Sequence, residues 1–151
     1  MRCWWDAPPE GGRQLNQMTL GGLAMASCPL CDLDDSEIEI VFERKLTLFL
    51  RHPRYQGALK HSGIIIPKAH RPTAFDLTPD EWQATRELLV EVRQWIDARY
   101  EPAGYNLGWN CWPVGGQEVM HAHLHVIPRF AQEPLAGEGI RSHLKSARNR
   151  W

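Results

Sequence analysis

Residues 121–129 read His-Ala-His-Leu-His-Val-Ile-Pro-Arg, with a histidine at every second position at the start of the stretch. A period of two residues is typical of a β-strand, whose successive side chains leave opposite faces. The strand expected over Val119–Ile127 therefore has two unlike faces. One carries His121, His123 and His125, and the other carries Ala122, Leu124 and Val126. Because each buried imidazole needs hydrogen-bond partners, three in register indicate a reactive or ligand-binding surface and not a packing surface.

The composition describes a globular chain about one domain long. It has 151 residues, of which 43% are hydrophobic and 23% charged, so it can bury one core. A net charge of -1 provides no basic field, which disfavours duplex nucleic acid or an anionic membrane as the main partner. No apolar run is long enough to span a bilayer, and the patch before Cys28 is a poor secretion signal. We therefore expect a cytoplasmic protein.

Three regions are expected along the chain: a flexible N-terminal extension at 1–26, a folded domain at 27–131 and a C-terminal tail at 132–151. Inside the domain the residue pattern alternates between strand and helix periods. The expected elements are a hairpin of Glu37–Phe42 and Leu46–Leu50, a strand at Ile64–Ile66, a helix from Thr78 to near Pro102, a strand at Tyr105–Trp109 and a turn at Trp112–Gly116. The helix start rests on an N-cap threonine, a proline and a glutamate placed for a capping box. This order indicates an α+β fold with an antiparallel sheet.

Cys28 and Cys31 form a C-x-x-C pair, which indicates a metal or redox site more than a disulfide framework. His121 and His125 should lie ~13 Å apart along a strand, so one ion cannot easily hold all three histidines. We expect the thiol pair to bind zinc with His70 and, as a fourth ligand, His121. A closed tetrahedral site of this kind is structural. A redox pair is the alternative, disfavoured because a strand and not a helix is expected to follow.

That assignment leaves His123 and His125 for reaction chemistry. A neutral imidazole is a nucleophile near pH 7, and its attack on phosphorus forms a phosphohistidine-type intermediate that water can open. The neighbouring histidine can donate a hydrogen bond to the phosphoryl oxygens or to the leaving group. Gly115-Gly116-Gln117 lies just before the strand. Backbone N–H groups freed by glycine can cradle anionic oxygens, and the amide of Gln117 can orient water or a leaving group.

These motifs resemble those of the histidine triad (HIT) family of nucleotide-binding hydrolases and transferases. The resemblance covers roughly Cys28–Phe130 and rests on Cys28–Cys31, Ile64–His70, Phe75–Thr78, Gly104–Asn106, Gly116–Gln117 and His121–Arg129. It implies an antiparallel sheet with one long helix and a short accessory helix, and a homodimer whose sheets join across the interface. It also implies that a nucleoside monophosphate group binds over the histidine strand and that cleavage occurs at the phosphorus next to the nucleoside.

Matched by position, the resemblance implies that His123 is the nucleophile, that His125 contacts the phosphate and that the Gln117 amide lies near the leaving group. Asn106 falls where related proteins place a phosphate-site asparagine, and Gly116 would also bind substrate. Zinc-containing bacterial members are similar in their ligands, which here are Cys28, Cys31, His70 and His121. The chain departs from many relatives at Glu118, where they carry a hydroxyl residue, and at His61, which receives no role.

We therefore expect a hydrolase that cleaves dinucleoside polyphosphates or nucleoside phosphoramidates at the α-phosphorus through a nucleotidyl-His123 intermediate. Transferases of the same superfamily carry glutamine at the third motif position, so His125 favours water as the acceptor. Two alternatives stay open. One is a cupin-like enzyme in which His121, His123 and an acidic residue hold a catalytic ion inside a β-barrel. The other is a nucleotide-binding sensor with little turnover, which Glu118 suggests. The basic C-terminal tail is either solvated or contributes to substrate choice.

Overall fold

The computed structural model describes residues 28–33, 35–53, 56 and 59–144. The extension expected at 1–26 and the end of the tail, residues 145–151, lie outside the described residues. Within the described part of the chain the fold is α+β, as the sequence predicts.

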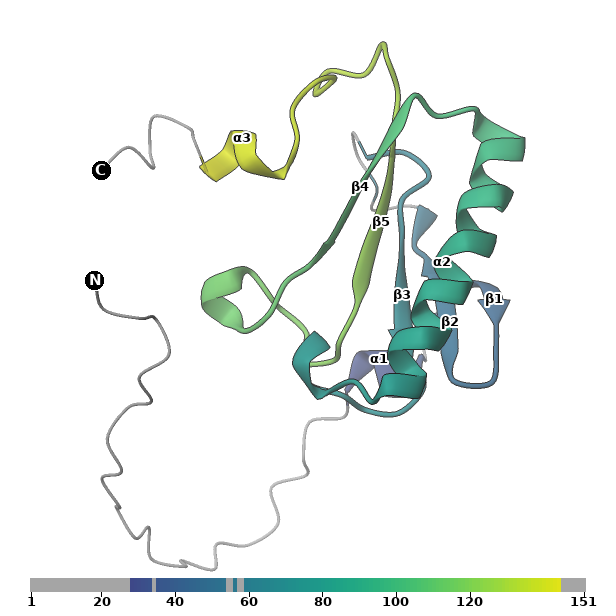
Figure 1. Ribbon diagram of the computed structural model, residues 1–151, viewed down its shortest axis with the longest axis vertical. Helices are drawn as coiled ribbons and strands as arrows, with labels where there is room; N and C mark the ends of the chain where they lie inside the picture. Colours follow the sequence, from purple (N-terminus) through teal and green to yellow (C-terminus); the bar gives the residue numbers. More distant parts are fainter. Residues whose placement is uncertain (1–27, 34, 54–55, 57–58, 145–151) are drawn as a thin grey trace, which may run out of the picture.

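A five-stranded antiparallel sheet with the order β1-β2-β3-β5-β4 forms the centre of the molecule (Figure 1). Its strands are β1 (Glu39–Glu43), β2 (Thr47–Arg51), β3 (Gly63–Pro67), β4 (Gly104–Trp109) and β5 (Leu124–Arg129). The long helix is α2 (Pro79–Tyr100), and the short helices are α1 (Pro29–Asp32) and α3 (Ile140–Leu144), with 3-10 turns η2 (Ala74–Asp76) and η3 (Pro113–Gly115). The predicted hairpin, third strand, long helix and fourth strand are all confirmed, with ends shifted by at most two residues.

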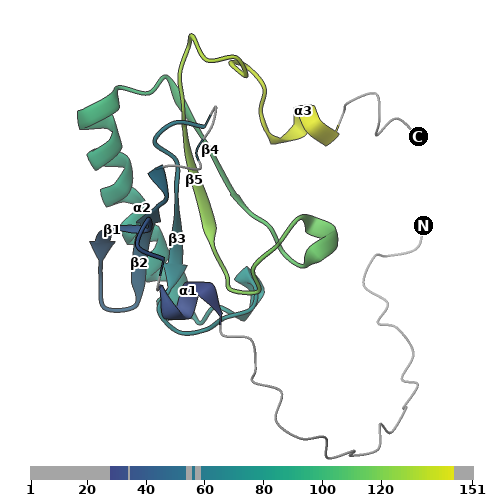
Figure 2. The same ribbon diagram turned by 180° about the vertical axis from the view of Figure 1, so that it is seen from behind.

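The two faces of the sheet are covered differently. Helix α2 packs on one face, where its apolar stripe of Leu88, Val92 and Ile96 meets Phe49, Ile65, Leu124 and Val126. Seen from behind, α1 lies on the opposite side of the sheet (Figure 2). There Leu30, Leu33 and Ile38 cover Leu48, Leu50 and Ile66. Residues 124 and 126 therefore point into the main core, as the alternation predicts, and His125 points to the face covered by α1.

The predicted start of the histidine strand is wrong. We expected a strand over Val119–Ile127, but β5 begins at Leu124, so His121 and His123 lie in the irregular segment before it. The neighbouring strand β3 ends at Pro67, which has no N–H to continue the ladder. The N–H of Ala122 donates instead to the carbonyl of Arg71 at 2.6 Å. His121 and His123 therefore lie outside the strand on whose face the period of two places all three histidines.

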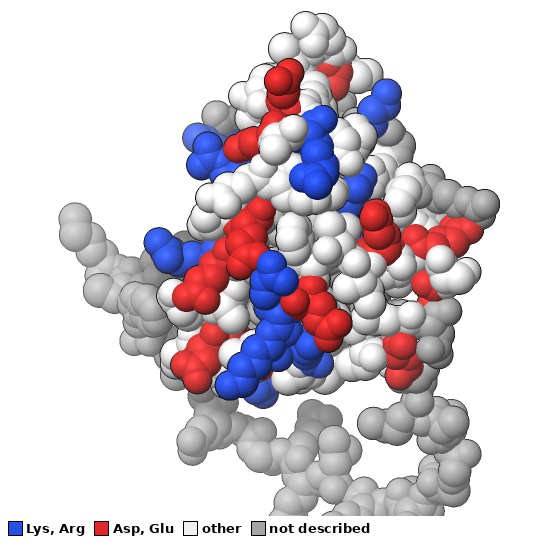
Figure 3. Space-filling view, turned by 90° about the vertical axis from the view of Figure 1, so that its right-hand side faces the viewer, with Lys and Arg blue, Asp and Glu red and all other residues white. Residues whose placement is uncertain are grey.

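Among the residues that the structure describes, the sheet is open, with β1 and β4 at its edges, and does not close into a barrel. The cupin-like alternative, which requires a β-barrel, is therefore wrong. No helix in the described residues is long and apolar enough to cross a membrane. On the face drawn in Figure 3, acidic and basic side chains of the described residues are interspersed and form no field of a single sign.

Helix α2 begins with the predicted capping box. The Thr78 hydroxyl accepts a hydrogen bond from the N–H of Glu81 at 3.2 Å, and the Glu81 carboxylate accepts one from the N–H of Thr78 at 2.8 Å. The same carboxylate is buried and pairs with the Arg71 guanidinium at 3.0 Å. Because the Arg71 carbonyl binds the N–H of Ala122, this ion pair connects the start of α2 to the segment that carries His121 and His123.

We predict that Glu81→Gln lowers the free energy of unfolding by about 2 kcal/mol, because it breaks a buried ion pair whose arginine is one-third exposed and weakens the capping box. Burial raises the pKa of Glu81, but hydrogen bonds from Thr78 and Arg71 outweigh it and the net pKa is lowered from 4.5. Because the pKa is lower in the folded state, the ionised carboxylate stabilises the fold above pH 4.5. This stabilisation is lost as the pH falls from 4.5 through the lower folded-state pKa. In urea titrations the difference between wild type and Glu81→Gln should therefore shrink on acidification; a difference that grows would contradict the prediction.

Candidate functional site

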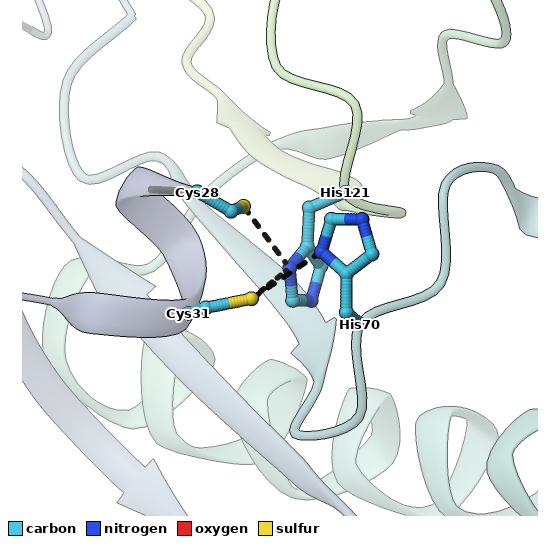
Figure 4. A group of neighbouring side chains, drawn as sticks. All are labelled: Cys28, Cys31, His70 and His121. Atoms are coloured by element: carbon cyan, nitrogen blue, oxygen red, sulfur yellow. Dashed lines mark hydrogen bonds between the residues drawn. The ribbon is translucent and has the colours of Figure 1, made fainter. Parts of the chain in front are cut away.

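Four side chains from three separate segments converge beside α1. Cys28 and Cys31 come from the start of α1, His70 follows β3, and His121 precedes β5. Figure 4 shows the two thiols facing the two imidazole rings. The four ligand atoms all lie within 4.8 Å of one another. His121 is fully buried, whereas Cys31 and His70 are exposed, so the cluster lies at the surface with one buried wall.

The distances in this cluster fit a tetrahedral zinc ion. With Zn–S bonds of ~2.3 Å and Zn–N bonds of ~2.1 Å, tetrahedral geometry places sulfur and nitrogen ~3.6 Å apart. The Cys28 Sγ lies 3.6 Å and the Cys31 Sγ 3.5 Å from the His121 Nδ1, and the Cys31 Sγ lies 3.3 Å from the His70 Nδ1. The His121 Nε2 lies 2.9 Å from the Pro67 carbonyl oxygen, which can only accept. The proton is therefore on Nε2, and the Nδ1 lone pair faces the thiols, as ligation requires.

The next histidine has the opposite tautomer. The Nδ1 of His123 lies 2.7 Å from the carbonyl oxygen of His121, so Nδ1 carries a proton and, in the neutral ring, Nε2 keeps its lone pair. This Nε2 is the nucleophilic atom of a neutral imidazole. The His123 ring is 9% exposed and lines a cavity of about 380 Å³, so it is sheltered and still reachable.

His125 lines the same cavity, with its ring 4.9 Å from that of His123 and nearly perpendicular to it. Burial lowers the pKa of His125, and a charge on His123 would lower it further, so the ring is neutral at pH 7. Its Nε2 is buried and has no hydrogen-bond partner among the described residues. A buried polar atom without a partner is unfavourable unless a ligand binds it.

A second cavity of about 250 Å³ adjoins the first. The two share Leu30, Ile64 and His125 in their walls. Most of the second cavity is apolar, lined by Ile38, Leu50, Leu59 and Ile127. Its polar lining residues include His52, Gln56 and Ser62, which follow β2. An apolar pocket with a few polar groups at its end suits an aromatic base and its sugar.

The turn before the histidines is arranged differently from the sequence-based expectation. The Gln117 amide is buried and donates to the carbonyls of Pro72 at 2.6 Å and Val119 at 3.0 Å, while its oxygen accepts from the N–H of Trp112 at 2.8 Å. The N–H groups of Gly115, Gly116 and Gln117 donate to carbonyls inside the turn. The glycine N–H groups therefore do not form the expected anion cradle here, and Gln117 holds the turn in place. Its role near a leaving group stays a prediction.

Asn106 does not line the cavity of His123 and His125. It lies in β4, where its side chain accepts a hydrogen bond from Arg129 and lines a separate cavity whose walls include residues 136–139. The asparagine that lines the His123 cavity is Asn110, whose amide donates to the Gly116 carbonyl at 3.1 Å. The sequence analysis did not select Asn110. Its position between the end of the Tyr105–Trp109 strand and the Gly-Gly turn is the feature that could have indicated it.

His61 and Glu118, where the chain departs from many relatives, lie in different places. His61 stacks on Tyr100 with ring centres 3.8 Å apart and does not line the His123 cavity. Glu118 is exposed and lines that cavity, together with Gly116 and Val119 from the same turn.

The sequence and the fold are similar to those of known proteins. The HIT domain family profile matches residues 35–132. An uncharacterised HIT-like protein of Methanocaldococcus jannaschii is 33% identical over 109 residues, covering 68% of this chain and 79% of the relative. A crystal structure of a HIT family protein from Bacillus anthracis superposes with a TM-score of 0.63 at 31% identity, covering 72% of this chain and 77% of that one.

Two relatives from Schizosaccharomyces pombe are named as enzymes. The adenosine 5'-monophosphoramidase is 26% identical over 117 residues, 78% of this chain and 85% of the relative. The asymmetrical bis(5'-nucleosyl)-tetraphosphatase is 33% identical over 66 residues, 44% of this chain and 36% of the relative. Two further curated relatives are matched over only 58% and 55% of their own length.

Proposed function

Because the chain belongs to the HIT domain family, we propose that it is a nucleotide hydrolase that cleaves dinucleoside polyphosphates or nucleoside phosphoramidates at the α-phosphorus. Relatives named as a phosphoramidase and a tetraphosphatase support this reaction class. The observation that carries the proposal is the His123 tautomer, with an unprotonated Nε2 at the wall of a cavity shared with His125.

In the proposed reaction the nucleoside occupies the apolar cavity and the phosphorus lies over His123. The His123 Nε2 forms a bond to phosphorus as the bond between phosphorus and the leaving oxygen or nitrogen breaks. A leaving nitrogen takes up a proton from the solvent in this step, whereas a leaving phosphate oxygen departs as an anion. Water then attacks phosphorus, the P–Nε2 bond breaks, a proton is returned and the nucleoside monophosphate is released. His125, neutral and within the same cavity, donates a hydrogen bond to the phosphoryl oxygens.

We predict that His123→Ala lowers kcat/KM for adenosine phosphoramidate and diadenosine tetraphosphate by roughly 10³-fold or more, because no other group supplies the nucleophile. His61→Ala, which removes an imidazole outside the cavity, is the matched control and should retain turnover. Mass spectrometry of rapidly quenched wild-type protein should detect a nucleotidyl adduct. Turnover by His123→Ala at the wild-type rate would exclude the mechanism, and tight AMP binding without turnover by wild type would favour the sensor.

We also propose that the chain is of the zinc-containing type, with Cys28, Cys31, His70 and His121 as ligands of a structural ion. The converging ligand atoms and the tautomer of His121 support this assignment. A closed shell of four protein ligands leaves no open position for substrate, so the ion would stabilise the fold by joining α1, the segment after β3 and the segment before β5.

Purified protein should therefore contain about one zinc per chain, and a chelator should lower Tm by about 5 °C or more. His70→Ala should lose the metal, whereas His123→Ala and His125→Ala should keep it. Elemental analysis measures the zinc content of each variant. Retention of stoichiometric zinc by His70→Ala, or its loss from His123→Ala, would contradict this ligand set.

The resemblance also predicts a homodimer, and we propose that β4 forms its interface. Strand β4 is an edge of the sheet, with backbone groups available for pairing with another strand. Leu107 in the middle of β4 and Trp82 at the start of α2 are both more than two-fifths exposed. Antiparallel pairing of two β4 strands would join the sheets and cover these apolar side chains.

Light scattering at micromolar concentration should therefore report a dimer for wild type and a monomer for Leu107→Lys, because a buried unpaired ammonium opposes association. Val114→Lys, a substitution of a fully exposed valine in η3, is the control and should remain dimeric. A monomeric wild type, or a Leu107→Lys variant that stays dimeric, would refute the β4 interface.

A further inference from the structure

The leaving group of the proposed reaction has a defined place. The apolar cavity suits the base and sugar, and it meets the His123 cavity at His125. A phosphorus over His123 therefore projects its leaving group into the rest of the His123 cavity. The walls there come from the turn before the histidines and include Asn110, Gly116 and Val119.

The charge of that space is negative. Among the described residues that line the His123 cavity, Glu118 is the only carboxylate, and no lysine or arginine is present; the two histidines are the other titratable groups. Glu118 makes no hydrogen bond or ion pair with any other described residue. A carboxylate with no protein partner at the wall of a cavity repels an anion and attracts a cation.

From this arrangement we propose that Glu118 selects a leaving group that carries a positive charge. The preferred substrates are nucleoside phosphoramidates of amines with a second, cationic amino group. Dinucleoside polyphosphates, whose leaving group is a multiply charged anion, are disfavoured. The inference rests on the proposed hydrolase function and adds the substrate class to it.

The step is the same for every phosphoramidate. The His123 Nε2 bonds to phosphorus, the P–N bond breaks, and the departing nitrogen gains a proton to become an amine. Water then opens the nucleotidyl-histidine and returns the proton, so the net reaction consumes one water and yields AMP and the amine. The second amino group takes no part in bond breaking. It interacts with Glu118 by charge alone, so its effect is on kcat/KM and is sensitive to salt.

The test uses adenosine 5'-phosphoramidates of linear amines that differ only at the far end of the chain. One series ends in a methyl group, one in an ammonium and one in a carboxylate. Each series includes several chain lengths, because the length decides how close the end group comes to Glu118. Wild-type protein should hydrolyse the ammonium-ended compound about 5-fold faster, in kcat/KM, than its methyl-ended counterpart, and the carboxylate-ended compound more slowly. Salt at about 1 M should reduce both differences.

The variants isolate the charge of Glu118. Glu118→Gln should bring the ammonium-to-methyl ratio of kcat/KM close to one, and Glu118→Lys should invert the preference and improve the rate with diadenosine tetraphosphate relative to the ammonium-ended compound. Glu87→Gln changes the net charge equally but lies on α2, on the opposite face of the sheet, and should keep the wild-type ratio.

The two proposals fail in different ways. Hydrolysis of all phosphoramidates by wild type at equal kcat/KM would overturn the inference and leave the hydrolase function intact. Persistence of the preference in Glu118→Gln would assign it to another group and would also overturn the inference. Absence of turnover with every compound, including the methyl-ended series, would remove the proposed function and this inference with it.

Discussion

Two backbone carbonyls determine what the histidines of this protein can do. The Pro67 carbonyl binds the Nε2 of His121, and the His121 carbonyl binds the Nδ1 of His123. Each carbonyl fixes the proton on the nitrogen that it contacts, so neighbouring histidines of identical chemistry present opposite nitrogens. One lone pair faces two thiols and the other faces a cavity. A candidate metal-binding cluster and a candidate nucleophile can therefore lie two residues apart without competing for the same ring.

The rest of the structure holds these carbonyls in position. Pro67 ends β3, the segment after it carries His70 and Arg71, and the Arg71 carbonyl binds the N–H of Ala122 between the two histidines. The Arg71 side chain is bound by Glu81 at the start of α2, and the stripe of α2 that follows packs on the core under β5. The irregular segment before β5 is thus fixed from both ends, although it belongs to no strand. A pocket residue on such a segment keeps a defined orientation only because the adjacent elements are rigid.

Local sequence patterns predicted most of the fold and part of the site. The capping box and the alternation of Leu124 and Val126 are local signals, and the structure confirms what they predict for α2 and for the core face of β5. The start of β5 depends on how far its neighbour β3 can supply N–H groups, which no pattern within residues 121–129 encodes. The same limit explains Asn106 and Asn110: Asn106 lies within β4 and Asn110 directly after it, and only the course of the chain through η3 decides which side chain lines the His123 cavity. Gln117 has the residue type for catalysis, but three backbone groups occupy its amide.

Leu30 shows how the cysteine cluster and the cavities depend on each other. It lies between Cys28 and Cys31 in α1 and forms part of the walls of both cavities. Helix α1 has only four residues, and such a short helix is not stable by hydrogen bonding alone. Its position depends on packing against Leu48, Leu50 and Ile66 and on the contacts of its two thiols with His70 and His121. A group that fastens these four side chains together would therefore also set the position of Leu30. The cysteine pair then has a second consequence besides stability, because it shapes the space in which a nucleoside and its phosphorus would lie.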